Sequence, residues 1–103
     1  TEKIYDNGGL KMDEIARLYT GNVTSEETLI DSTNGVVLKT ILIGNRNEEK
    51  ATVSINIDGA DFSFDIDPNK TLIIDNPIVC NILKASSNVN VDIHISGIRL
   101  GEV

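Results

Sequence analysis

The feature that most constrains this chain is a strict alternation of apolar and polar side chains. Between residues 89 and 95 every second residue is Val or Ile, and Asn90, Asp92 and His94 stand between them. Residues 51–57 alternate in the same way. Because successive side chains of a β-strand point to opposite faces of its sheet, both segments are predicted to be strands with one buried face.

Turn signals separate these strands from their neighbours. Asp58-Gly59 lies between two alternating runs and predicts a β-hairpin. Asp67-Pro68-Asn69-Lys70 predicts a β-turn, because proline presets the φ angle that such a turn needs. Further breaks are expected at residues 75–77 and 86–88. Turn signals at such short, regular spacing are typical of β-sandwiches.

Two segments depart from simple alternation. Residues 36–43 are apolar at both parities except at Lys39 and Thr40, as expected of a strand that is covered on both faces or is central in its sheet. After Gly97 the apolar positions shift by one residue. A glycine at such a shift predicts a β-bulge.

The N-terminal part carries weaker signals. Residues 15–20 and 27–31 are candidate strands, and a helix over residues 11–18 is the alternative for the first of them. Residues 1–13 are predicted to be an N-terminal arm, and residues 14–103 a single domain. We therefore predict an all-β fold: a single antiparallel β-sandwich, jelly-roll-like, with seven to eight short strands.

Composition limits the classes of partner. The net charge of −7 disfavours nucleic acid and anionic lipid, because phosphate contacts rely on Lys and Arg. No apolar run approaches the ~20 residues with which a helix spans a membrane. Cys80 is the only cysteine, which excludes an intrachain disulfide, and no secretory signal is visible. We expect synthesis in a reducing cytoplasm.

Side chains capable of chemistry are few and isolated. His94 is the only histidine, and a solvent-facing or cross-strand polar residue is a simpler interpretation than a base or a metal ligand. Cys80 shares the parity of Ile78 and Ile82, so a buried thiol is simpler than a nucleophile. No catalytic residue, cofactor site or metal site is therefore predicted.

Acidic side chains gather in one segment. Asp58, Asp61, Asp65 and Asp67 could offer oxygen ligands to calcium, with Asp58 and Asp61 meeting across the hairpin turn. The residue order of an EF-hand is absent, and solvated turn acids are the alternative interpretation. The charged segment 46–50 is interpreted as a connection between two strands and not as a site.

Aromatic residues bear on carbohydrate binding, because β-sandwiches that bind sugars commonly use exposed aromatic platforms. Phe62 and Phe64 share the inward parity of their strand, which leaves only Tyr5 and Tyr19 for such a surface. The sequence therefore gives little support to a lectin.

Six short motifs follow one another along the chain: "LYTGN" (18–22), "KTILIGN" (39–45), "KATVSINIDG" (50–59), "DNPIV" (75–79), "ILKASSNVNV" (82–91) and "HISGI" (94–98). Their order and spacing resemble small β-sandwich virion proteins of tailed bacteriophages. The resemblance covers roughly residues 15–100, and its specificity lies in the order and spacing of its motifs. The chain departs from the family pattern at Cys80-Asn81, where the family often has a Gly-Asp turn, so a tighter corner is expected there.

The resemblance implies a non-enzymatic structural role in the virion, as a head decoration, head-fibre, neck or tail accessory component made in the host cytoplasm. The implied partners are other virion proteins and further copies of the chain. Apolar residues of the arm, together with one residue of the first strand, are the candidate contacts: Ile4, Tyr5, Leu10, Met12 and Tyr19. The alternative is a β-sandwich module that binds carbohydrate or a host surface.

Overall fold

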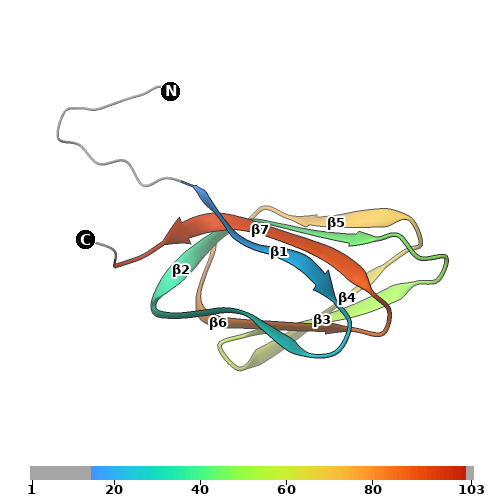
Figure 1. Cartoon of the computed structure of the whole chain (residues 1–103), viewed down its shortest axis with the longest axis horizontal. Helices are drawn as coiled ribbons and strands as arrows, with labels where there is room; N and C mark the ends of the chain where they lie inside the picture. Colours follow the sequence, from blue (N-terminus) through green and yellow to red (C-terminus); the bar gives the residue numbers. More distant parts are fainter. Residues whose placement is uncertain (1–14, 102–103) are drawn as a thin grey trace, which may run out of the picture.

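Seven β-strands and the turns between them make up the part of the chain that the computed structural model describes, residues 15–101 (Figure 1). Within this range no residue is helical, so none of it forms a helix that could cross a membrane. The predicted strand near residue 15 is confirmed, and the alternative helix is wrong over residues 16–18. The strands are β1 (Ala16–Val23), β2 (Glu27–Asn45), β3 (Ala51–Ile57), β4 (Ala60–Ile66), β5 (Lys70–Ile74), β6 (Ile78–Ser87) and β7 (Val91–Arg99).

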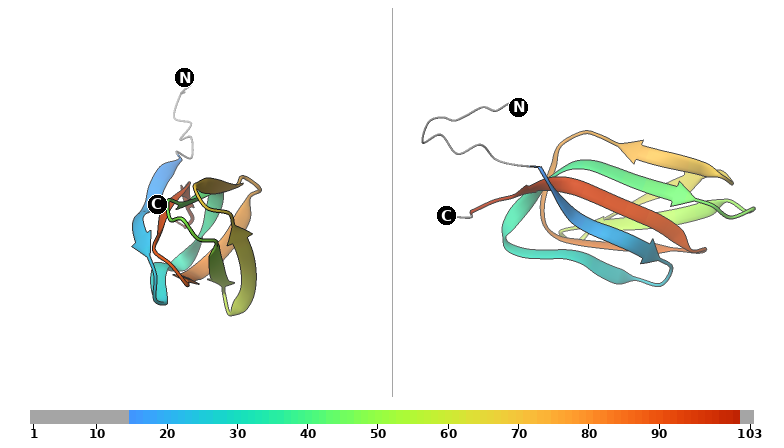
Figure 2. Two further views of the ribbon diagram at one scale, coloured as in Figure 1. Left: turned by 90° about the vertical axis from the view of Figure 1, so that its right-hand side faces the viewer. Right: turned by 45° about the horizontal axis from the view of Figure 1, so that its top comes forward.

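All strand pairs are antiparallel, and together they form one sheet. The hydrogen-bonded order is β1-β7-β2-β6-β3-β4, and β5 pairs with β2 outside this path. The predicted all-β, antiparallel class is confirmed. The sheet curls so that β1, β7 and β5 lie across from β6, β3 and β4 (Figures 1 and 2). The jelly-roll type stays a prediction.

The long strand β2 connects the two halves of the curled sheet. Its first part and residues 36–38 pair with β6, whereas residues 36–44 pair with β7 and residues 41–45 with β5. The two strands predicted from the sequence are therefore one. They meet at an irregularity before Val36, where Gly35 has a φ of 92° that other residues rarely adopt.

A bulge explains why β2 is apolar at both parities. Val36 and Leu38 are buried, but the next buried side chains are Ile41 and Ile43. The register with β7 shifts between Leu38 and Thr40, so one extra residue moves the inward face to the other parity. The strand is central, as one alternative predicted. The other alternative, burial on both faces, is wrong.

The bulge predicted near Gly97 lies on the neighbouring strands and not on β7. The alternation of buried residues in β7 continues through Gly97, while β1 and β2 each carry an extra residue opposite it. A Cβ atom on Gly97 would overlap the carbonyl oxygen of Val37 and approach Leu18 to 2.8 Å. The glycine therefore marks a close approach of two backbones.

The predicted hairpin between β3 and β4 is confirmed. Asp58 and Gly59 form its two-residue turn, and their φ angles are 50° and 96°. Positive φ at both positions is typical of the type I′ turn, whose twist matches that of paired strands. The turn at residues 67–70 is also confirmed, and the Lys70 N–H donates to the Asp67 carbonyl at 3.2 Å.

Strand β6 does not contain the corner predicted at Cys80-Asn81. It runs without interruption, and its inward parity changes between Cys80 and Leu83, both of which are fully buried. Ile82 consequently points outward and is 39% exposed, so the expectation that it shares the face of Cys80 is wrong. The change of parity lies where the register with β2 is irregular, between Asp31 and Val36, and β6 makes no turn there.

The core is aliphatic. Among residues 15–101 seventeen hydrophobic residues are buried, and all are Val, Ile, Leu or Ala except Cys80. They come from every strand except β5 and include only Ile66 from β4. Among the described residues, the core is therefore open to solvent between the unpaired edges of β4 and β5.

Candidate functional site

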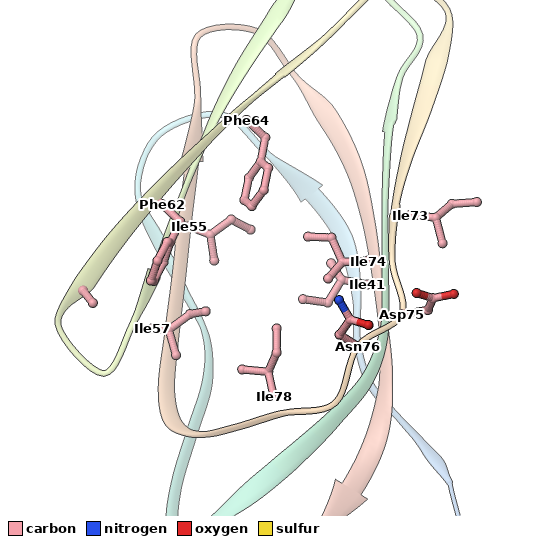
Figure 3. A pocket seen from close by; sticks show the side chains of 11 residues that line it. Ile41, Ile55, Ile57, Phe62, Phe64, Ile73, Ile74, Asp75, Asn76 and Ile78 are labelled. Atoms are coloured by element: carbon pink, nitrogen blue, oxygen red, sulfur yellow. The ribbon is translucent and has the colours of Figure 1, made fainter.

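An apolar groove opens between β4 and β5, and it is the first of two candidate sites. β4 pairs only with β3, and β5 only with β2, among residues 15–101. The groove between them holds about 580 Å³ (Figure 3). Most of its lining side chains point into the space, whereas Ile73 and Asp75 point away from it. The lining residues are Ile41, Ile55, Ile57, Ala60, Phe62, Phe64, Ile73, Ile74, Asp75, Asn76 and Ile78.

The two phenylalanines form one wall of this groove. In the β3–β4 ladder Phe62 lies opposite Ile55 and Phe64 opposite Val53, so they share the inward face, as the sequence predicts. Phe62 is nevertheless 49% exposed. No strand of the described chain lies beyond β4 to cover it. The expectation that inward parity removes both rings from the surface is therefore wrong for Phe62.

The aspartates of β4 form an acidic row on the opposite face of this strand. Asp61 accepts a hydrogen bond from the Asn56 side chain at 2.7 Å, and Asp65 accepts one from the Thr52 hydroxyl at 3.0 Å. Asp58 accepts from backbone N–H groups of β6 instead. These three carboxylates thus have separate partners, and no hydrogen bond to the Asp67 carboxylate is described. Among residues 15–101 no group of three or more His, Cys, Asp or Glu residues could hold a metal ion.

A polar hollow of about 560 Å³ on β1, β7, β2 and β5 is the second candidate site. Asp92 accepts from the Asn22 side chain and pairs with Arg46, whose Nε lies 2.6 Å from its Oδ2. Gly44 on β2 pairs with Asp92 on β7 and with Thr71 on β5. No side chain therefore lies between those of Asp92 and Thr71 on this face of the sheet. The hollow presents amide, carboxylate, guanidinium and imidazole groups on a flat sheet face.

His94 belongs to this hollow and makes cross-strand contacts. Its Nδ1 lies 2.7 Å from the hydroxyl oxygen of Thr20 on β1, and its Nε2 lies 3.3 Å from that of Ser96. The interpretation of His94 as a cross-strand polar residue is confirmed. No second ionisable side chain contacts its ring among the described hydrogen bonds.

Cys80 is a core residue. Its side chain is fully buried, and burial, with a smaller effect from the negative charge of Asp58, raises the pKa of the thiol to about 11. A thiol with a raised pKa holds little nucleophilic thiolate near neutral pH. The interpretation as a small buried hydrophobe is confirmed.

Tyr19 is half-buried on the edge strand β1. Its ring covers Gly21, where a Cβ atom would lie 2.6 Å from the tyrosine oxygen. The hydroxyl donates to Glu27 at 3.0 Å, and partial burial, together with this carboxylate, raises the pKa of the phenol. The other candidate contact residues, Ile4, Tyr5, Leu10 and Met12, lie outside the described residues, as does the arm.

Asn45 is a structural residue that the sequence did not reveal. It is 1% exposed, and its amide nitrogen donates to the carbonyls of Glu49 and Ile66 at 2.8 and 3.0 Å. Its amide oxygen accepts from the backbone N–H of Asn47 at 3.0 Å. The segment 46–50 is a connection, as predicted, and this buried amide holds it against the end of β4.

Comparison of the chain with models of known protein families gives no match, and comparison with curated proteins gives none.

Proposed function

We propose that this protein is a non-enzymatic structural component of a bacteriophage virion that works in multiple copies through protein–protein contacts. The observation that carries the proposal is the ordered set of motifs between residues 18 and 98. These motifs fall on strands that build one continuous core: β1, β2, β3, β6 and β7. The likeness therefore concerns residues that specify architecture.

The surface supports a role in assembly. Large apolar side chains are exposed on three strands: Phe62 on β4, Ile73 on β5, and Val79 and Ile82 on β6. The exposed fractions of Ile73 and Val79 are 61% and 63%. Phe62 lies in the apolar groove between β4 and β5, and an apolar groove that stays exposed is typical of a surface that another protein covers.

The test is incorporation into particles. Phage particles assembled with the full chain are expected to retain it through density-gradient purification. A chain that lacks residues 1–13 is expected to fold and remain outside the particles, because the proposed arm is then missing. Circular dichroism gives the control for folding. Normal incorporation of the shortened chain contradicts the role of the arm, and absence of the full chain from particles contradicts the virion proposal itself.

The polar hollow favours one second candidate, a module that binds carbohydrate on a host surface. Its amide, carboxylate and guanidinium groups are those that hydrogen-bond sugar hydroxyls, although no Phe, Tyr or Trp ring lines it. Saturable binding on a glycan array that Asn22→Ala abolishes would support this candidate. Glu48→Ala, at an exposed position outside the hollow, is the control. An array without saturable binding excludes the sugars it contains.

A further inference from the structure

The groove between β4 and β5 offers an incomplete sheet as well as an apolar surface. Each of these strands has one edge whose backbone groups pair with nothing else in residues 15–101. An extended segment placed beside β4 would gain main-chain hydrogen bonds and cover Phe62. Its inward side chains would meet Phe62 and Phe64, and its outward side chains would lie opposite Asp61, Ser63 and Asp65.

This geometry defines the chemistry of the occupant. A segment that fits has apolar side chains at alternate positions and a basic side chain between them. The chain contains that pattern once outside the described residues, at Gly9-Leu10-Lys11-Met12-Asp13. Leu10 and Met12 have one parity, and Lys11 has the other, together with Gly9 and Asp13.

We propose that residues 9–13 of one copy of this chain add as a strand to the free edge of β4 in a second copy. Leu10 and Met12 enter the groove beside Phe62 and Phe64. The added strand is antiparallel to β4, with Lys11 opposite Asp61 and Gly9 opposite Ser63. In this register Asp13, which shares the parity of Lys11, lies beyond the start of β4 and does not meet its aspartates. The inference rests on the proposed multi-copy function and names the surface that receives the arm.

The length of the chain decides between a second copy and the same copy. Met12 is four residues before Ala16, and four extended residues span at most about 14 Å. In its own half of the curled sheet β1 is three inter-strand steps from β5, in the order β1-β7-β2-β5, which is about 14 Å, and β4 lies farther still, across the groove from β5. The arm would also have to pass around its own strands. The segment therefore reaches β4 of a neighbour and not of its own subunit.

Charge also argues against the simplest alternative, direct pairing of β4 with β4 of another copy. Antiparallel pairing of two identical β4 edges would bring Asp61 and Asp65 of one copy beside those of the other. Like charges directly opposite each other destabilise a sheet. A strand that carries Lys11 at this position converts the repulsion into attraction.

Disulfide trapping with two different chains tests the docking. One full-length chain carries Gly9→Cys and a size tag, which keeps Lys11, and the other carries Ser63→Cys, at the exposed position of β4 that lies opposite Gly9 in this register. Cys80 stays in both because it is buried. The expected result is a mixed disulfide between the two chains on a non-reducing gel. A partner with Glu48→Cys in place of Ser63→Cys is expected to give none.

Charge reversal provides a second measurement that needs no cysteine. Lys11→Glu is expected to weaken self-association about fivefold by light scattering, and adding Asp61→Lys and Asp65→Lys in the same chain should restore it. No mixed disulfide, or no rescue, overturns the docking even if the chain is present in particles. A mixed disulfide in a chain absent from particles supports the docking and contradicts only the virion proposal.

Discussion

The carboxylate of Asp58, at the tip of the β3–β4 hairpin, accepts a hydrogen bond from the backbone N–H of Asn81 at 2.9 Å. The same oxygen accepts from the N–H of Ile82 at 2.8 Å, and the Asp58 N–H donates to the Ile82 carbonyl. The Asn81 side chain continues the contact to the carbonyls of Ser32 and Thr33. The turn of the β3–β4 hairpin thus hydrogen-bonds the part of β6 where the inward parity changes. Through the Asn81 side chain, this part of β6 in turn hydrogen-bonds the irregular part of β2.

The first prediction follows from the pKa of Asp58. The backbone N–H groups of Ile82 and Asn81 lower this pKa below its ordinary value, so the folded state favours the carboxylate. The stabilisation is present above the unfolded-state pKa of about 4 and is lost as pH falls through the lower folded-state pKa. Asp58→Asn keeps the shape and removes the charge. At neutral pH the unfolding free energy of the unchanged chain should exceed that of the Asp58→Asn variant. This difference should decrease below about pH 4.

Urea unfolding at a series of pH values gives this measurement. Asp67→Asn, in the next turn of the chain, is the matched control, because no hydrogen bond to its side-chain carboxylate is described. An excess that does not change with pH would show that charge is unimportant in the contact with β6.

The second prediction concerns the buried amide of Asn45. Asn45→Ala leaves the carbonyls of Glu49 and Ile66 without their donor, and leaving buried polar groups unpaired costs about 1–3 kcal/mol. We expect the unfolding free energy to fall by about 3 kcal/mol, measured by urea unfolding. Glu48→Ala, at an exposed position of the same connection, should change it by less than about 0.5 kcal/mol. Equal effects would contradict the role given to Asn45.

The third prediction concerns the close approach at Gly97. Gly97→Ala places a methyl group against the Val37 carbonyl, which belongs to a paired strand and cannot move alone. Overpacking of this kind should lower the unfolding free energy by about 3 kcal/mol or prevent folding. Gly44→Ala is the control, because its nearest contact is an ordinary 3.6 Å to the Thr71 hydroxyl. Thermal melts of both variants test the difference.

The fourth prediction concerns the thiol of Cys80. With a pKa raised to about 11 and a fully buried side chain, it should not react with a thiol reagent in the folded state near pH 8. Reaction should follow unfolding in urea, with a stoichiometry of one thiol per chain. Rapid reaction of the folded protein would show that β6 opens locally at this position.

Short-range patterns predicted much of the fold. The hairpin at Asp58-Gly59 and the turn at Asp67–Lys70 were readable because their residues favour specific backbone angles. The cross-strand position of His94 followed from parity alone. Alternation alone does not predict the parity changes in β2 and β6, because a bulge is determined by the partner strand and not by the sequence of one strand.

The candidate sites were less accessible to sequence reasoning. The exposure of Phe62 depends on β4 being the last strand, and nothing in its alternation distinguishes an edge strand from a covered one. The polar hollow brings together β1, the connection after β2, and β7, whose contacting residues Asn22, Arg46 and Asp92 are far apart in the chain. The sequence shows that β4 carries two phenylalanines, but it does not show that Phe62 is exposed.

By itself, the sequence determined that this chain forms short antiparallel strands with an aliphatic core, because alternation and turn chemistry act over a few neighbouring residues. Only the tertiary structure decided which strands are edges, where bulges move a face inward, and that Asp58 supports β6. These outcomes depend on contacts between segments distant in the chain. They also determine where the core remains open at the groove, and therefore where a partner segment can bind.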